Sequence, residues 1–272
     1  MSSLLLTPPP GRVLVMGVLN VTPDSFSDGG RFLSRERALA EARKHLADGA
    51  DILDIGGESS RPGAEPVGVE EELDRVLPVI RALTEETDTP ISIDTVKPEV
   101  AAECLRAGAR IVNDISGLSA PGMAERCAEA GASVVVMHMR GTPRTMQSDT
   151  RYNNVVVEIR DYLAERIEAA EAAGINEIAV DPGIGFGKTA EQNFELVRRL
   201  REFQSLGRPL LVGPSRKSFL GSLESKLPAD QRLEGTIAAC VASVLHGAAI
   251  VRVHDVGPVK RALEATEAIL NT

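Results

Sequence analysis

The most regular feature of the chain is a recurring order of three parts: a segment with helical periodicity, a glycine, and a short run of β-branched and aliphatic residues. Each apolar run is continuous rather than alternating, which is typical of a strand covered on both faces, as in a parallel sheet. Glycine fits directly after a helix because it adopts the left-handed backbone of that position at little steric cost. Six glycines stand in this place: Gly49, Gly108, Gly131, Gly174, Gly207 and Gly247.

Two further apolar runs raise the number of predicted strands to eight. One covers residues 13–19, and the other covers residues 91–94 and follows Pro90. The mean spacing of the eight strand starts is about 34 residues, enough for one strand and one helix. These starts lie near residues 13, 52, 91, 111, 134, 178, 210 and 250. Helical periodicity covers residues 35–47, 70–87, 155–173, 191–206, 234–246 and 259–270, and Thr189 and Gln192 are spaced as a capping box.

Eight strand and helix units without a linker or a change in composition predict an α/β protein with a single (β/α)8 TIM barrel. We therefore expect residues 1–272 to form one domain. A doubly wound open parallel sheet has the same alternation of strands and helices, and it is the alternative fold because the sequence does not reveal strand order.

Polar residues follow most of the predicted strands. In a barrel these positions meet at one face, where the chemistry of such folds takes place. The acids and amides at 94, 113 and 181 and the cations at 217 and 252 predict a ligand with a hydrogen-bonding heterocycle at one end and an anion at the other. The ring comprises Asn20, Asp54 with Glu58, Asp94, Asn113 with Asp114, Met137 with His138, Asp181, Gly213 leading to Lys217, and Arg252 with His254.

Composition and charge exclude several classes of protein. A chain of 272 residues with 43% hydrophobic and 25% charged residues can bury a large core. The formal net charge of −9 argues against nucleic-acid and anionic-membrane partners, which need a cationic surface. No apolar run approaches the ~18 residues of a membrane span, and the first residues do not resemble a secretory signal. Because Cys104, Cys127 and Cys240 are far apart, we expect reduced thiols in a cytoplasmic protein.

Two glycine-rich segments are candidate ligand loops. Residues 183–189 read GIGFGKT and end like a phosphate-binding loop. Pro182 stands where that motif needs a glycine, so we reject a nucleoside triphosphatase. In this segment Phe186 either presents an aromatic face to a ligand or anchors the loop to the barrel. The second segment follows the first strand and contains Phe26 and Asp28 in a long polar loop, which makes it a candidate lid.

Eight stretches of the chain, in order and over nearly its whole length, resemble the dihydropteroate synthase family. Each stretch alone is a weak signal, whereas eight in order at eight predicted strand ends are specific. The stretches are MGVLNVTPDSFSDGG (16–30), GGESSRPGA (56–64), ISIDT (91–95), VNDISG (112–117), VVMHMRG (135–141), DPGIGFGK (181–188), GPSRKSFLG (213–221) and VRVHDV (251–256).

The resemblance implies a pterin-binding barrel that joins 6-hydroxymethyl-7,8-dihydropterin diphosphate to 4-aminobenzoate, releasing diphosphate and 7,8-dihydropteroate. It implies Mg²⁺ as cofactor, a homodimer, and no nucleic-acid or membrane partner. The family's pterin positions match Asp94, Asn113, Asp181 and Lys217, with Ile115, Met137, Phe186 and Gly213 as walls. Its diphosphate positions match Asn20, Arg61, Arg252 and His254, with Asn20 also at the metal. Its aminobenzoate and loop positions match Phe26, Asp28, Ser60, Arg61, Pro62, Phe186 and Ser218.

Elementary chemistry agrees with these assignments. The 2-amino-4-oxopterin edge presents adjacent donors that a carboxylate accepts in pairs, so Asp94 or Asp181 suits it. Mg²⁺ is commonly bound through substrate phosphates and few protein oxygens, so the Asn20 carbonyl is adequate. Stabilisation of the departing diphosphate by Mg²⁺, Arg252 and His254 is then the main catalytic effect, with Asp28, Arg61 and Lys217 completing the predicted catalytic set. Because the aromatic amine is neutral at pH 7, its attack on the cationic pterin methylene needs no strong base.

Two other functions share parts of this pattern. A pterin-binding methyltransferase acting on methyltetrahydrofolate has the same barrel and pterin acids, but DSFSDGG, SRPG and SRK weigh against it. A catalytically silent pterin-binding paralogue is the other alternative, and intact Asn20, Lys217 and Arg252 weigh against that. We also expect the loops at 22–33 and 57–68 to be mobile in the free enzyme and to close over the pterin diphosphate.

Overall fold

The computed structural model describes residues 4–22, 30–61, 63–223 and 226–272, with the backbone alone for residues 30–34. Within these ranges eight strands alternate with eight α-helices. The strands are β1 (Leu14–Asn20), β2 (Ile52–Gly56), β3 (Ile91–Asp94), β4 (Ile111–Asp114), β5 (Ser133–Met137), β6 (Ile178–Asp181), β7 (Leu211–Val212) and β8 (Ile250–Val253). The helices are α1 (Gly30–Ala47), α2 (Val69–Glu86), α3 (Pro98–Arg106), α4 (Met123–Glu129), α5 (Val155–Ala172), α6 (Ala190–Arg198), α7 (Leu233–Leu245) and α8 (Val256–Leu270).

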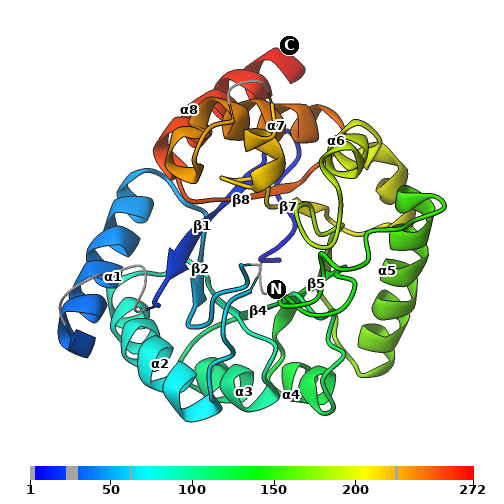
Figure 1. The fold of residues 1–272 in the computed structure, drawn as a ribbon. Coiled ribbons are helices and arrows are strands. Elements are labelled where there is room, and N and C mark those ends of the chain that lie inside the picture. The colour runs from blue at the N-terminus through cyan, green and yellow to red at the C-terminus, as the bar shows by residue number, and fades with distance from the viewer. Residues whose placement is uncertain (1–3, 23–29, 62, 224–225) are drawn as a thin grey trace.

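The strands form one parallel sheet that curls into a barrel, with the helices around it (Figure 1). The strand order is β6-β5-β4-β3-β2-β1-β8-β7. A single bridge between Val180 and Leu210 joins the two ends of the sheet, and the Val180 N–H donates to the Pro209 carbonyl at 2.9 Å. This topology confirms the predicted (β/α)8 barrel and excludes the doubly wound open sheet.

The sequence pattern located the strands closely and one helix incorrectly. All six glycines that precede strands have positive φ, from +64° to +112°, and the capping box of Thr189 and Gln192 is present. The helix predicted over residues 191–206 was wrong in its second half. There α6 ends at Arg198 and a 3-10 helix covers Leu200–Leu206. Leu200 and Phe203 are both fully buried, and the period of three in a 3-10 helix places residues three apart on one side.

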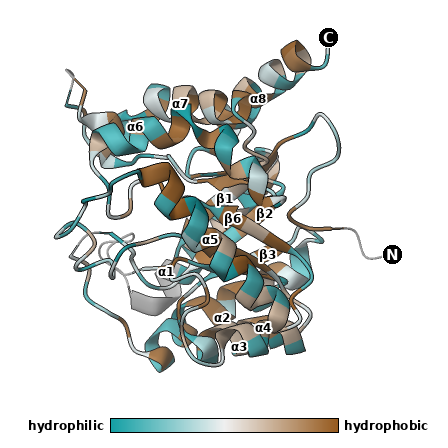
Figure 2. Cartoon of the chain, turned by 90° about the vertical axis from the view of Figure 1, so that its right-hand side faces the viewer, coloured by the Kyte–Doolittle hydropathy of each residue, from teal (hydrophilic) through white to brown (hydrophobic). Residues whose placement is uncertain are grey.

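Alternation along the strands divides the core into two parts. Residues that point outward pack against the helices in the larger apolar cluster. A separate cluster, the apolar plug, fills the lower barrel. It comprises Leu6 of the N-terminal segment and the inward strand residues Met16, Ile52, Ile111, Val135, Ala179, Leu211 and Ile250. Figure 2 shows hydrophobic residues along the strands, while the surrounding helices carry both hydrophobic and hydrophilic residues. No helix within the described ranges is both long and apolar enough to span a membrane.

The inward positions two residues further along each strand form the upper layer of the barrel. Because side chains in a strand alternate with a period of two, these residues share the inside of the barrel with the apolar plug below them. The upper layer comprises Val18, Asp54, Asp94, Asn113, Met137, Asp181, Gly213 and Arg252, which follow Met16, Ile52, Ser92, Ile111, Val135, Ala179, Leu211 and Ile250. The carboxyl ends of the strands are therefore where the predicted site residues meet.

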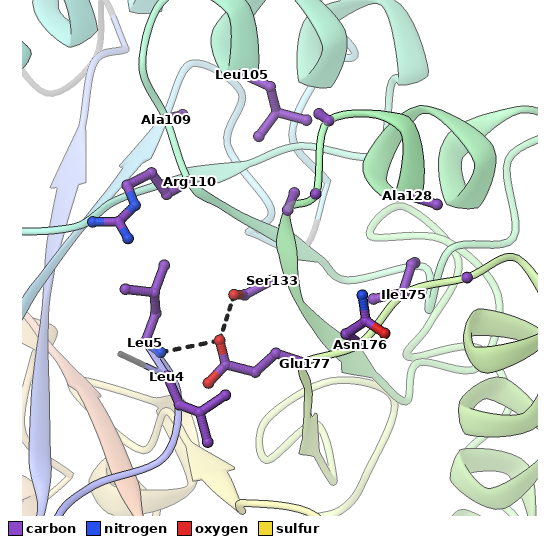
Figure 3. A pocket seen from close by; sticks show the side chains of 14 residues that line it. Leu4, Leu5, Leu105, Ala109, Arg110, Ala128, Ser133, Ile175, Asn176 and Glu177 are labelled. Atoms are coloured by element: carbon purple, nitrogen blue, oxygen red, sulfur yellow. Dashed lines mark hydrogen bonds between the residues drawn. The ribbon is translucent and has the colours of Figure 1, made fainter. Parts of the chain in front are cut away.

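The opposite end of the barrel is closed by the N-terminal segment. Leu6 is fully buried, and the backbone N–H groups of Leu5 and Leu6 donate to the Glu177 carboxylate at 3.0 and 2.8 Å. A cavity of about 380 Å³ lies beside this segment (Figure 3). Ser133 also donates to Glu177, at 2.5 Å, so the carboxylate that faces the cavity is already occupied. This cavity is separate from the polar upper layer.

Candidate active site

Arg252 lies at the centre of the polar layer, between two carboxylates. Its Nε donates to Asp54 Oδ2 at 2.5 Å, and its second guanidinium nitrogen, Nη2, donates to Asp94 Oδ2 at 2.7 Å. Asn113 Nδ2 donates to the same Asp54 oxygen at 3.1 Å. Strands β2, β3, β4 and β8 thus supply one connected network, which fixes the guanidinium at the barrel mouth.

This network corrects the predicted separation of charges. The sequence pattern suggested acids and amides at one end and cations at the other, whereas Arg252 lies between the acids. Asp54 is fully buried and holds both Arg252 and Asn113, yet the sequence argument placed it in the ring without assigning it to the site. Its inward position, two residues after Ile52, is the signal that could have found it.

Burial and neighbouring charges shift the pKa values of Asp94 and Arg252 in this network. Burial raises the pKa of Asp94, and the attraction of Arg252 opposes that rise. For Arg252, burial opposes the charge, but Asp54 and Asp94 outweigh it and raise the pKa of the guanidinium above its usual value. Arg252 therefore remains a cation throughout the physiological range.

A second group of polar residues surrounds the glycine-rich loop after β6. The Gly183 N–H donates to Asp181 Oδ1 at 2.7 Å. Burial raises the pKa of Asp181 to about 6, although the Gly183 N–H and the Lys217 ammonium act in the opposite direction. Burial, together with the repulsion of Arg252, lowers the pKa of Lys217 to about 8. Asp181 and Lys217 are consequently an anion and a cation near pH 7.

Lys188 holds this loop from within, a role that the sequence argument missed. Its buried Nζ donates to the carbonyls of Gly183 and Phe186, both at 2.8 Å, and lies 3.2 Å from His138 Nδ1. Burial lowers the pKa of Lys188 to about 7, and Asp181 opposes this shift. The lysine that made the segment look like a phosphate loop therefore binds the loop's own backbone.

Apolar side chains line the side of the site next to this loop. Ile115, Met137 and Phe186, the residues predicted as pocket walls, are buried together in one cluster. Met146, which the sequence argument did not single out, completes the buried cluster, and Val96 and Met139 pack against it. Phe186 is buried in this cluster and its ring contacts the Lys217 ammonium, so it anchors the loop, and its predicted role toward a ligand stays a prediction.

His254 lies where β8 ends, beside the loop after β7. Its Nδ1 is 3.0 Å from Ser215 Oγ, and its backbone N–H donates to the same oxygen at 3.2 Å. Burial, with the positive charges of Arg252 and Arg216, lowers the pKa of His254 to about 3. His254 is therefore neutral at physiological pH.

The remaining predicted site residues lie at the ends of β1 and β7 and in the loops around the barrel mouth, outside the hydrogen-bonded network of Arg252. Asn20 is half-buried at the end of β1, and Gly213 is half-buried above β7. Ser60 is half-buried, while Arg61 and Ser218 are exposed around the rim. Phe26, Asp28 and Pro62 lie outside the described residues, as does most of the predicted lid. The structure brings Asp94, Asn113, Asp181, Lys217 and Arg252 together in the polar layer, and the ligand-binding and catalytic roles of all the predicted site residues stay predictions.

Comparison with known proteins gives this barrel its class. A family model described as pterin binding enzyme matches residues 16–254. The fold, the polar layer and this match together define a pterin-binding enzyme. A dihydropteroate synthase of Synechocystis is 48% identical over 261 residues, covering 95% of this chain and 90% of that protein. The chain belongs to the dihydropteroate synthase family.

Two solved structures support the same assignment at the level of the fold. The dihydropteroate synthase of Xanthomonas albilineans, solved with 4-aminobenzoic acid, is 44% identical with a TM-score of 0.91, covering 96% of this chain and 94% of that one. The dihydropteroate synthase of Burkholderia cenocepacia, complexed with 7,8-dihydropteroate, is 43% identical with a TM-score of 0.87, covering 96% and 92%. The barrel architecture is thus shared with family members of known structure.

Proposed function

We propose that this enzyme, a transferase of the dihydropteroate synthase family, carries out its reaction at the polar upper layer of the barrel. It joins 6-hydroxymethyl-7,8-dihydropterin diphosphate to 4-aminobenzoate and releases diphosphate and 7,8-dihydropteroate. The observation that carries the proposal is the connected set of buried acids, amide and cations at the carboxyl ends of the strands. Relatives solved with 4-aminobenzoic acid and with 7,8-dihydropteroate support the substrate and product classes.

The pterin ring fits the side of the site formed by β3 to β6. Asp181 offers a carboxylate beside the Gly183 N–H, Asn113 offers an amide that both donates and accepts, and Lys217 offers a cation to a ring acceptor. Ile115, Met137 and Phe186 supply apolar faces for the ring. Because Arg252 occupies one oxygen of Asp94, that acid orients Arg252 as well as facing the ring.

The diphosphate fits the side near β1 and β8. Arg252 stays cationic and offers a positive charge to the diphosphate. His254 is neutral and offers a directional hydrogen bond. Arg61 lies exposed on the turn after β2, from which it could reach the same anion. Fixed donors of this kind stabilise charge that develops on a leaving group, which is the main catalytic effect we assign to the site.

The residues present fit a Mg²⁺ ion that is bound mostly through the substrate. The described residues contain no group of three or more His, Cys, Asp and Glu side chains that could hold a metal. Asn20 offers one neutral oxygen, which suits an ion that keeps phosphate and water ligands. Bound there, Mg²⁺ would neutralise negative charge on the diphosphate oxygens. Asn20 is therefore the residue we assign to the metal.

The aminobenzoate reacts at the outer edge of the site. We place it among Phe186, Ser218, Ser60 and the loop residues Phe26, Asp28, Arg61 and Pro62. Its amine is neutral at pH 7, so attack on the cationic methylene needs correct placement rather than a base. The comparisons favour this transferase over a methyltransferase or a silent paralogue, because the named relatives are dihydropteroate synthases.

Two further assignments belong to the proposal. We assign the protein to the cytoplasm because Cys104, Cys127 and Cys240 are all buried free thiols, and burial raises the pKa of each to about 12. We assign a homodimer because the neighbouring helices α6, α7 and α8 expose large apolar side chains, namely Phe194, Leu245, Ile269 and Leu270. Sedimentation equilibrium tests the dimer.

The central experiment is calorimetry with pterin diphosphate, Mg²⁺ and 4-aminobenzoate added in turn, followed by a turnover assay. Formation of dihydropteroate and diphosphate in equal amounts is the expected result. Tight pterin binding without turnover would indicate the silent paralogue instead.

A further inference from the structure

Ser215 and His254 meet because the register of two strands continues beyond the strands themselves. In the ladder of β7 and β8, Leu211 pairs with Ile250 and Val212 pairs with Val251. Ser215 contacts His254 at the same separation of 39 residues. The contact is thus set by the barrel and does not depend on a chance loop conformation.

The hydrogen bonds of Ser215 determine where its proton goes. The hydroxyl is buried, and its oxygen accepts from the backbone N–H of His254 at 3.2 Å. The same oxygen lies 3.0 Å from His254 Nδ1. If Nδ1 carried a proton, Ser215 would accept twice and its own buried hydrogen would need a third partner. If Nδ1 is bare, the hydroxyl donates to it and both groups are satisfied.

The charges around His254 favour a neutral ring. Arg252, Arg216 and Lys217 oppose a proton there, and Asp255 favours one. Asp255 is itself held by Arg216, whose Nε and Nη2 donate to its two oxygens at 3.0 and 2.7 Å. This pair also keeps the separation of 39 residues. A neutral ring carries one N–H proton. Whether that proton is on Nδ1 or on Nε2 decides whether Nε2 accepts or donates a hydrogen bond to a ligand.

We propose that Ser215 is a positioning residue that holds His254 in the tautomer with its proton on Nε2, so that this neutral histidine donates a hydrogen bond to the leaving diphosphate. The identity of the acceptor rests on the proposed function, whereas the tautomer is a property of the free protein. A histidine fixed in this tautomer donates a directional hydrogen bond to the diphosphate without placing a second full positive charge beside Arg252.

The first test is the ring nitrogen spectrum of the ligand-free, uniformly ¹⁵N-labelled protein between pH 5 and 8. Of the four histidines, His254 is assigned by the signals that His254→Gln removes. The expected pattern is an unprotonated Nδ1 and a protonated Nε2 throughout. A protonated Nδ1, a doubly protonated ring or an average of the two tautomers would overturn the proposal. Because no substrate is present, failure here leaves the proposed function standing.

The second test is Ser215→Ala, with Ser243→Ala as the matched control. Ser243 is also buried and donates to a backbone carbonyl, that of Ala239, within α7. We expect Ser215→Ala to average the two His254 tautomers and to lower kcat about tenfold, with the affinity for unphosphorylated pterin unchanged. Ser215→Thr, which keeps the hydroxyl, should restore both readouts. An unchanged His254 spectrum in folded Ser215→Ala would contradict the role of Ser215.

Discussion

The ammonium nitrogen of Lys217 lies 3.7 Å from the centre of the Phe186 ring. A cation over an aromatic face at this distance is attracted by about 0.5–2 kcal/mol, more as the pair is desolvated. The contact joins the loop after β6 to the loop after β7. These two strands are connected by a single bridge, between Val180 and Leu210. The contact explains why a chain with few aromatic residues places one in a glycine-rich loop.

Asp181→Asn should separate stability from function. The pKa of Asp181 is about 6 in the folded protein, against 3.8 for an ordinary aspartate. Ionising this carboxyl therefore costs more in the folded state than in the unfolded state, so the Asp181 charge destabilises the fold increasingly as pH rises from about 4 to 6. The variant should therefore gain up to about 3 kcal/mol in the free energy of unfolding at pH 8 and little at pH 4. Its pterin affinity should be lost. Urea unfolding at both pH values and calorimetry measure this, with exposed Asp161→Asn as control.

Pterin affinity should depend on pH in a bell shape. Below about pH 6 Asp181 becomes protonated and no longer accepts two donors, and Asp94, whose pKa burial also raises, contributes to the same acid limb. Above about pH 8 Lys217 loses its proton. His254 stays neutral over this range and contributes neither limb. Titrations with unphosphorylated pterin from pH 5 to 9 measure the profile. A flat profile would remove both residues from the pterin contact.

Lys188→Met should loosen the loop that carries Phe186. The change leaves the carbonyls of Gly183 and Phe186 without their buried donor, at a cost of about 1–3 kcal/mol for an unsatisfied group. We expect about tenfold weaker pterin binding and easier proteolysis of the loop at residues 182–188. Lys44→Met, at an exposed lysine of α1, is the control. Unaltered pterin affinity in Lys188→Met would show that the loop holds its shape without the ammonium.

Removal of Mg²⁺ should affect the diphosphate and spare the pterin. A chelator is expected to abolish turnover and leave the affinity for unphosphorylated pterin within twofold, since the ion's ligands come mainly from the phosphates. Asn20→Ala should raise the Mg²⁺ concentration needed for half-maximal rate. Full activity in excess chelator would refute the metal assignment.

Arg61→Ala should lower turnover far more than pterin affinity. Arg61 is exposed after β2, so we expect it to act on the diphosphate and aminobenzoate rather than on the buried ring. In the unaltered enzyme, diphosphate with Mg²⁺ should strengthen 4-aminobenzoate binding, and in Arg61→Ala this effect should shrink. Titration of aminobenzoate with and without diphosphate decides the point, and equal affinities in the unaltered enzyme would exclude ordered binding.

Much of the barrel can be derived from the sequence because its signals are local. A continuous apolar run followed by a polar residue predicts a strand and its carboxyl end, and a glycine with positive φ ends the preceding helix. The period of two then places Asp54, Asn113 and Arg252 on the inside, above the apolar plug. Those features need no knowledge of distant contacts.

Other features depend on which distant residues the closed barrel brings together. The pairing of Arg252 with Asp54 and Asp94 joins positions 198 and 158 residues apart, and no local pattern distinguishes it from separated charges. The turn of Lys188 onto its own loop and the contact of Ser215 with His254 likewise arise from packing and from strand register. By itself, then, the sequence determined the elements and the end of the barrel at which polar groups gather, because propensity and periodicity are encoded locally. Only the tertiary structure decided which acid holds which cation, because partners compete across the barrel mouth and distance selects among them.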